Sequence, residues 1–222
     1  MTTILRLDSS VRHNDSSQQS HRSISKQLGD VFIQTWLERL SDTNIIHRDL
    51  SQNPPSFIHA EWLGAVFSEP TQRSDAQSAL LEESDQYIAE VEQADVIMIT
   101  SPMYNYGMPA VLKAWFDQVI RIHKTFSFDL SRGDFPLEPI FSGKTLVLLS
   151  STGEFGFERG GIREHMNHLG THIQVLSHYL GIEYFYEIRS EYQEFADQRH
   201  KNSSENAKFQ TIELAKKLTS SD

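Results

Sequence analysis

Two tyrosines and an asparagine occupy consecutive positions, 104–106, in the segment SPMYNYGMP. Aromatic rings stack on flat ligands, and the backbone N–H groups of a loop can meet carbonyl oxygens and ring nitrogens. Tyr104, Asn105 and Tyr106 therefore suit a flat heteroaromatic ligand. The alternative is that Tyr104 and Tyr106 are half-buried packing residues, and the place of this loop in the fold favours the ligand.

Two prolines define the ends of this loop. Pro102 biases Ser101 away from helical geometry, whereas Pro109 suits the first turn of a helix. The intervening residues are predicted to project as a short loop, with Gly107 in a backbone conformation that other residues resist. The helix that follows carries an apolar stripe expected in the core or in a subunit interface: Val111, Leu112, Trp115, Val119 and Ile122.

A second polar loop, DSSVRHNDSSQQSHRSISKQL at residues 8–28, is rich in hydroxyl groups and opens a helix. It contains neither a Gly-x-Gly-x-x-Gly motif nor a Walker lysine motif. Serine hydroxyls and the free N–H groups of a helix N-terminus can still hold a phosphate. Ser10, Ser23 and Ser25 are the candidates, the alternative being that these serines only cap the helix.

A third loop, SSTGEFGFERGG at residues 150–161, contains glycines that allow the backbone to approach a ligand closely. Ser151, Thr152 and Gly153 are expected to reach the same crevice as the other two loops. The rest of the segment is interpreted as either more of that wall or a mobile lid.

Short apolar runs and helical patterns alternate along the chain, and these elements must position the three loops. Strands are predicted at TILRLDS (3–9), TNIIHRDL (43–50), DVIMITS (95–101), KTLVLLSS (144–151) and EYFYEI (183–188). Helices are predicted over 23–41, 74–92, 109–122, 163–181 and 203–218.

This alternation predicts an α/β fold, with a five-stranded parallel sheet covered by helices on both faces. The number of strands and the length favour a flavodoxin-like order, 2-1-3-4-5, in one domain spanning residues 1–222. In that order the ligand crevice forms where the strand order reverses, between the carboxyl ends of the first and third strands. The serine loop and the tyrosine loop follow those two strands.

Charge and composition restrict the partners. The net charge of −10 argues against nucleic acid and against an anionic membrane surface, so a small molecule is the expected partner. The chain has no run of about eighteen apolar residues and no signal-peptide pattern at its start, which favours a cytoplasmic protein. It has no cysteine, so any redox chemistry must belong to a bound cofactor.

With these loops in place, the chain resembles the FMN-dependent NADH azoreductases, flavodoxin-like enzymes related to the NAD(P)H quinone reductases. The likeness extends over nearly the whole length. It rests on LDSS, on SISKQL for the family's Ser-x-Ser-x-x-Leu helix opening, on RDLSQNPP, on KTFSF and on GKTLVLLSSTGE. Its specific part is SPMYNYGMPAVLKAWFDQV, which matches the family's Pro-Met-Tyr-Asn-Phe loop and the helix after it.

The resemblance implies the positions of the FMN contacts. Ser10 and the residues Ser23, Ile24 and Ser25 would surround the phosphate. Met103, Tyr104, Asn105 and Tyr106 would lie along the isoalloxazine ring, and Ser151, Thr152, Gly153 and Glu154 would lie at its far side. The chain departs from the family in three places: the serine loop is longer, so that serines 16, 17 and 20 compete for the phosphate, Tyr106 replaces the commoner phenylalanine, and TGE replaces a common Arg-Gly-Gly.

The reaction implied is ping-pong: NADH passes hydride to FMN and leaves, and a quinone or aromatic azo compound then takes two electrons. The cofactor carries this chemistry, so no side chain is nominated as an obligatory acid or base.

His165 and His168 are interpreted as surface residues, the alternative being a role in the pocket. The family forms homodimers. The long segment 126–141 is predicted to form part of the wall of the substrate pocket.

Three alternatives remain. An NAD(P)H-dependent flavin reductase would use the same site with another acceptor. A flavodoxin-type electron carrier would not be an enzyme, and such carriers are typically shorter. A serine esterase would use LDSS together with Asp197 and His200 of DQRH, but the sequence lacks a Gly-x-Asn-Asp segment for an oxyanion hole.

Overall fold

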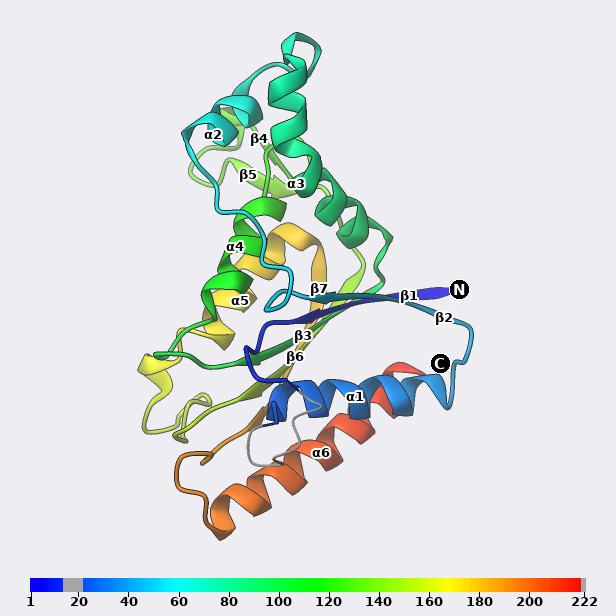
Figure 1. Ribbon diagram of the computed structural model, residues 1–222, viewed down its shortest axis with the longest axis vertical. Helices are drawn as coiled ribbons and strands as arrows, with labels where there is room; N and C mark the ends of the chain where they lie inside the picture. Colours follow the sequence, from blue (N-terminus) through cyan, green and yellow to red (C-terminus); the bar gives the residue numbers. More distant parts are fainter. Residues whose placement is uncertain (14–21, 221–222) are drawn as a thin grey trace.

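The computed structural model of the chain describes residues 1–13 and 22–220. A parallel sheet lies at its centre, with the strand order β2-β1-β3-β6-β7 (Figure 1). This is the predicted order 2-1-3-4-5, which is confirmed. The five strands are β1 (Thr2–Asp8), β2 (Thr43–Asp49), β3 (Val96–Pro102), β6 (Lys144–Ser151) and β7 (Ile182–Ser190).

Helices cover both faces of this sheet, as predicted. One face carries α1 (Ile24–Leu37) and α6 (Gln198–Leu218), which lie side by side (Figure 1). The other face carries α3 (Asp75–Gln93), α4 (Ala110–Val119) and α5 (Gly170–Ser177). The inner strands β3 and β6 are buried along almost all of their length because helices cover both faces of the sheet there, whereas the edge strands β2 and β7 are more exposed.

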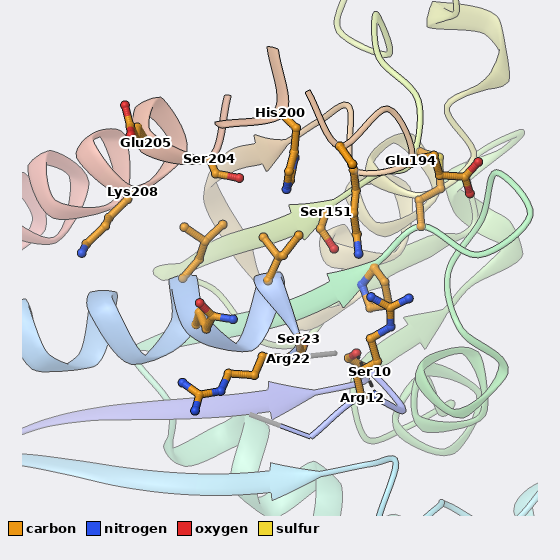
Figure 2. Close-up of a pocket in the computed structure, with 18 of the residues that line it drawn as sticks. Ser10, Arg12, Arg22, Ser23, Ser151, Glu194, His200, Ser204, Glu205 and Lys208 are labelled. Atoms are coloured by element: carbon orange, nitrogen blue, oxygen red, sulfur yellow. Dashed lines mark hydrogen bonds between the residues drawn. The ribbon is translucent and has the colours of Figure 1, made fainter. Parts of the chain in front are cut away.

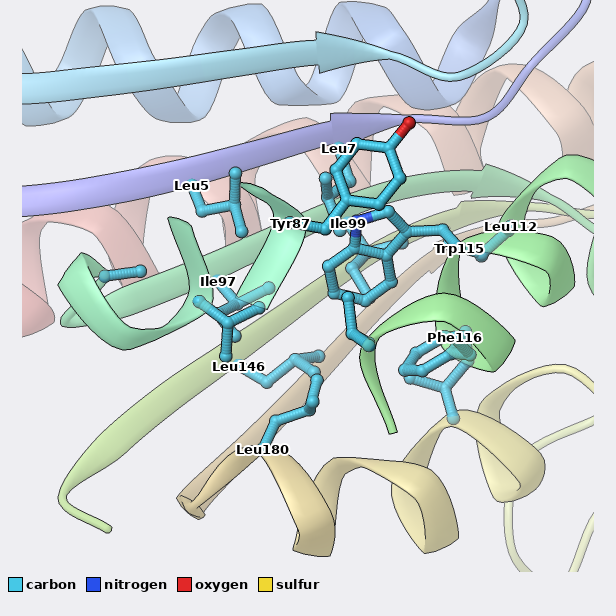
Figure 3. Close-up of a cluster of buried hydrophobic side chains, with 14 of the residues drawn as sticks. Leu5, Leu7, Tyr87, Ile97, Ile99, Leu112, Trp115, Phe116, Leu146 and Leu180 are labelled. Atoms are coloured by element: carbon cyan, nitrogen blue, oxygen red, sulfur yellow. The ribbon is translucent and has the colours of Figure 1, made fainter. Parts of the chain in front are cut away.

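The sheet separates two hydrophobic clusters because successive side chains of a strand point to opposite faces. Along β1, Ile4 packs with α1 and α6, whereas Leu5 and Leu7 pack with α3, α4 and α5. Trp115 and Phe116 of α4 fill the second cluster, with their ring centroids 5.1 Å apart in an edge-to-face arrangement (Figure 3). Most of the apolar stripe predicted for this helix is therefore core.

One predicted helix is wrong over its first half. Residues 163–181 form a short 3-10 helix, η4 (Glu164–Met166), then α5, then η5 (His178–Leu180). Asn167 interrupts the helix because its Oδ1 accepts hydrogen bonds from the N–H groups of Leu169 (3.3 Å) and Gly170 (3.0 Å). A side chain that bonds to the nearby backbone in this way competes with the helix.

Other boundaries differ by a few residues, and several short elements were not predicted. α4 ends at Val119 rather than near residue 122, and α6 begins at Gln198, five residues before the predicted start. The additional elements are α2 (Ala60–Phe67), η2 (Pro70–Gln72), β4 (Phe126–Phe128), η3 (Leu130–Arg132) and β5 (Leu137–Pro139). β4 and β5 pair with each other as an antiparallel hairpin.

Within the described residues, no helix is both long enough and apolar enough to cross a bilayer. The same residues contain no cluster of three or more His, Asp or Glu side chains placed to hold a metal ion.

Candidate functional site

A cavity of about 790 Å³ opens at the carboxyl ends of β1, β3 and β6 (Figure 2). Its volume is in the range of about 300–1,000 Å³ that is usual for cofactor sites. All three predicted loops contribute to its lining, which includes Ser10, Ser23, Ile24, Met103, Tyr104, Ser151 and Gly153. Five further predicted residues stand beside the lining rather than in it: Ser25, Asn105, Tyr106, Thr152 and Glu154.

The strand register brings these loops together. Asp8 lies opposite Thr100, and Pro102 lies opposite Ser151, so the three strands end at one edge of the sheet. Two backbone bonds then hold the emerging loops: Ser9 N–H donates to the Thr100 carbonyl (3.0 Å), and Met103 N–H donates to the Ser151 carbonyl (2.8 Å). The base of the cavity is therefore fixed by the sheet itself.

The first turn of α1 forms one end of the cavity. Ser23 is the N-cap residue, and its Oγ accepts from Lys26 N–H at 3.3 Å. The other N–H groups of a first turn have no partner within the helix, and the helix dipole makes this end positive. Ser25 lies behind Ser23, fully buried, with the two hydroxyl oxygens 3.3 Å apart. Serines 16, 17 and 20 lie outside the described residues.

Two features hold this helix end against the sheet. Lys26 is buried, and its Nζ lies 2.6 Å from Oδ2 of Asp49 at the end of β2. Burial raises the pKa of Asp49, but the hydrogen bonds from Lys26 and Ser51 outweigh that effect and the net shift is downward. Gly29 allows close approach, because a Cβ there would stand 2.7 Å from the Cγ2 of Thr100.

Asp8, at the end of β1, is the centre of a buried polar network beside the cavity. Its carboxylate accepts from Arg6 Nε (2.9 Å) and from Thr100 Oγ1 (2.8 Å), and it lies 2.9 Å from His47 Nε2. Burial alone raises the pKa of Asp8, but these partners together lower it to about 2. The carboxylate is thus charged at neutral pH and orders the end of β1 next to Ser9 and Ser10.

The tyrosine loop is a tight turn. Tyr104 and Gly107 exchange backbone hydrogen bonds of 2.9 and 3.0 Å, with Asn105 and Tyr106 between them. Both central residues have positive φ, 47° and 67°, as a type I′ turn requires. The prediction for Gly107 was wrong, because its φ is not positive. Asn105 and Tyr106 adopt the left-handed conformation instead, and for Tyr106 this costs roughly 1–2 kcal/mol.

The loops after β6 and β7 support each other at the far side of the cavity. Thr152 Oγ1 donates to the carbonyl of Glu154 (2.8 Å), and the N–H of Glu194 donates to the carbonyl of Gly153 (3.1 Å). The rings of Phe155 and Tyr192 stack, with centroids 4.4 Å apart and planes 13° from parallel. The glycine-bearing loop is therefore held as a wall by the connection that follows β7.

Several lining residues were missed from the sequence. They come from the serine loop, α1, the connection after β7 and α6. They include Gln27 and five residues that Figure 2 labels: Arg12, Arg22, Glu194, His200 and Lys208. His200 and Lys208 lie in a run of charged residues, which is typical of a solvated helix face. Only the packing of α6 beside α1 brings them to the cavity.

Two other predictions concern residues that lie outside the cavity. None of the lining residues belongs to 126–141, so the prediction that this segment forms a wall of the pocket is wrong for the cavity of the single chain. The segment instead folds back on itself through the β4–β5 pairing. His165 and His168 are exposed and stand outside the lining, and the backbone N–H of His168 donates to the carbonyl of Tyr106 at 2.9 Å.

The contacts of Asp197 and His200 do not form a catalytic dyad. Asp197 caps α6 by accepting from Arg199 N–H (2.9 Å), and its carboxylate also pairs with the Arg199 guanidinium. His200 Nδ1 lies 2.9 Å from the carbonyl oxygen of Glu191. An esterase would need Asp197 on that imidazole nitrogen, so this geometry disfavours the esterase.

Comparison with known proteins identifies relatives over the whole chain. The profile of a family described by a flavodoxin-like fold matches residues 9–212. A protein of Colwellia psychrerythraea named FMN-dependent NADH:quinone oxidoreductase 2 is 57% identical over 218 residues, which cover 98% of this chain and 100% of that protein. A protein of the same name from Idiomarina loihiensis is 55% identical over 219 residues, covering 99% and 91%.

Solved structures show the same fold at low sequence identity. An FMN-dependent NADH-azoreductase of Bacillus anthracis, solved in complex with FMN, superimposes with a TM-score of 0.84 at 16% identity and covers 99% of this chain and 100% of its own. An NAD(P)H:quinone oxidoreductase of Methanothermobacter marburgensis gives a TM-score of 0.70, also at 16% identity, with coverage of 100% and 98%.

Proposed function

The chain belongs to the family with the flavodoxin-like fold, and from its relatives and its site we propose that it is an FMN-dependent NADH:quinone oxidoreductase. One observation of the structure supports this most: a single cavity joins a capped helix N-terminus at one end to an aromatic loop at the other. An anion-binding end and a flat wall are the two parts that a flavin mononucleotide needs.

The residues present fit FMN. We place its phosphate at Ser10, at Ser23 and at the first turn of α1 beside Ile24, with Ser25 supporting Ser23 from behind. We place its ring along Met103 to Tyr106, with Ser151 to Glu154 at the far side. Arg12 and Arg22 line the same cavity and bring positive charge that favours a phosphate.

When bound, FMN accepts hydride from NADH and delivers two electrons to the acceptor. The side chains bind and orient the reactants. The buried Asp8 network and the Lys26–Asp49 pair keep the phosphate end rigid, and the tight turn at 104–107 presents its aromatic residues at a fixed position. No obligatory acid or base is required among them.

Aromatic azo compounds are a second class of acceptor that we propose. They are flat, as quinones are, and the loop that would meet them is open: the exposed fractions of Tyr104 and Tyr106 are 37% and 39%. An open aromatic site over a flavin can accept flat molecules of both classes. Free flavin as the acceptor remains the alternative within reductases.

We further propose that residues 1–222 act as one FMN-binding domain and that two chains form a homodimer. Large apolar side chains are exposed on α2 and on the segment 126–141, with Phe67 at 73%, Leu130 at 75% and Phe135 at 85%. Exposed apolar surface of this kind marks an interaction site.

We also place the enzyme in the cytoplasm, where NADH is available.

The experiment that tests the proposed function is reconstitution. The purified chain is stripped of flavin, and the oxidation of NADH by benzoquinone is followed with and without added FMN. We expect activity to require FMN and to saturate when the chain is fully loaded. Activity that is independent of FMN, or no activity in the FMN-loaded chain, would contradict the proposal.

A further inference from the structure

Two loops that line the cavity are joined by a contact between side chains. The hydroxyl of Tyr106, in the loop after β3, donates to Oε2 of Glu154, in the loop after β6, at 3.1 Å. Phenylalanine has no hydroxyl and alanine has no carboxylate, so either replacement would remove this contact.

Arg163 completes this contact. Its guanidinium Nη2 lies 3.0 Å from Oε1 of Glu154, so the two carboxylate oxygens have different partners. Arg163 is itself held in place, because its Nη1 donates to the carbonyl of Phe155 at 3.1 Å and its guanidinium lies 4.7 Å from the centre of the Phe155 ring. We call Tyr106, Glu154 and Arg163 the rim bridge.

The rim bridge joins the loop after β3 to the loop after β6. Their neighbours Tyr104 and Gly153 line the cavity, whereas Tyr106 and Glu154 stand outside its lining. At the base, the same two loops are joined by the bond from Met103 N–H to the Ser151 carbonyl. The loops are thus joined at the sheet and again farther along each loop, where the centre of the Tyr106 ring also lies 6.3 Å from that of the Phe157 ring and the Tyr106 carbonyl accepts from His168 N–H.

The geometry points to a specificity-determining role for the rim bridge: by fixing the separation of the two loops, it restricts bulky acceptors relative to small quinones. This inference rests on the proposed function. The Glu154 carboxylate raises the pKa of the Tyr106 phenol, so the phenol keeps its proton and stays a donor at neutral pH. A hydrogen bond to a charged group contributes more to stability than a neutral one, so its loss is expected to change the position of the loop.

The first test is a double-mutant cycle on acceptor choice. Wild type, Tyr106→Phe, Glu154→Ala and the double variant are compared by the ratio of kcat/KM for a two-ring azo dye to kcat/KM for benzoquinone. Each single change is expected to raise this ratio about fivefold, the factor that corresponds to one lost hydrogen bond. The double variant is expected to rise no further, because either change alone breaks the bridge.

The second test measures the loop without any turnover. Hydrogen exchange of the Tyr104 and Gly107 amides in the flavin-free chain should become faster in Tyr106→Phe. Tyr184→Phe is the matched control, because Tyr184 is an exposed tyrosine on β7 outside the cavity, and it should change neither the exchange nor the ratio.

An unchanged exchange rate in Tyr106→Phe would overturn the inference, and so would an unchanged acceptor ratio or additive effects in the double variant. If the FMN-loaded wild-type chain reduces neither benzoquinone nor the azo dye with NADH, the proposed function fails, and the acceptor inference fails with it. The exchange measurement would still report whether the rim bridge holds the two loops, so the two failures are distinguishable.

Discussion

Asp8 combines deep burial with a full negative charge, and the network around it keeps that charge stable. The cost of burying a carboxylate is offset by the hydrogen bonds from His47, Arg6 and Thr100. Because its pKa in the folded chain is about 2, lower than its ordinary value of 3.8, Asp8 stabilises the fold above about pH 4. That contribution is lost as the pH falls toward 2.

We predict that Asp8→Asn lowers the free energy of unfolding by about 2 kcal/mol at pH 7. The difference between wild type and variant should shrink by about half at pH 3, since Asp8 is then mostly protonated in the unfolded chain but still mostly charged in the folded chain. Denaturant unfolding at both pH values measures it. Asp134→Asn, at an exposed carboxylate of the 126–141 segment, controls for the loss of one charge, and a pH-independent difference for Asp8→Asn would contradict the assignment.

At the residue scale, the sequence predicted which loops meet but not how every residue contributes. Seven of the twelve candidate residues line one cavity, because residue type and position after a strand are local properties. Which of the five others contact a ligand remains a prediction. The error at Gly107 has a physical reason: the exchanged bonds of Tyr104 and Gly107 place the two residues between them in the left-handed region, whatever their types.

Helix α1 shows how one element serves both the fold and the site. Its N-cap, Ser23, lines the cavity and accepts from Lys26 N–H. α3 offers the matched comparison, because its N-cap Ser74 accepts from Gln77 N–H in a capping box and lies outside the cavity.

We predict that Ser23→Ala and Ser74→Ala each lower the free energy of unfolding by about 1 kcal/mol, the usual cost of a lost cap. Only Ser23→Ala should also weaken FMN binding, by roughly tenfold, which corresponds to one lost hydrogen bond to a charged phosphate. Calorimetric titration with FMN measures this. If both variants bind FMN as wild type does, the phosphate lies elsewhere in the serine loop.

At the element scale, long periodic segments were predictable and interruptions were not. The five core strands and helices α1 and α3 follow from patterns that each segment carries by itself. The break at Asn167 depends on whether its side chain bonds to Leu169 and Gly170 or points outward, and a helical pattern does not distinguish these. The β4–β5 hairpin is only three residues long on each side, too short for a period to show.

At the scale of the whole molecule, the strand order was predictable because right-handed crossovers leave few arrangements for alternating strands and helices. The contribution of α6 to the cavity was not, since it depends on packing between segments about 180 residues apart, as in the hydrogen bond from Arg39 to Thr219. The exposure of the apolar residues on α2 and the 126–141 segment also depends on the whole fold, so local sequence patterns could not predict it.

We predict that the chain sediments as a dimer and that Phe67→Glu weakens the dimer more than tenfold, because a buried charge at an apolar contact costs several kcal/mol. Sedimentation equilibrium measures the association constant. Phe209→Glu is the matched control: Phe209 is 63% exposed on α6, which covers the other face of the sheet, and its replacement should leave the dimer intact (Figure 1). A wild-type chain that sediments as a monomer would refute the proposed assembly.

The most direct test of the central claim is an anaerobic titration of the FMN-loaded chain followed by visible absorption. NADH should bleach the flavin absorption with one equivalent per bound FMN, and benzoquinone added afterwards should restore it. A non-enzymatic electron carrier would not be bleached by NADH alone. If NADH fails to bleach the loaded chain, or if the chain retains no FMN, the account of this protein as an FMN-dependent NADH:quinone oxidoreductase is contradicted.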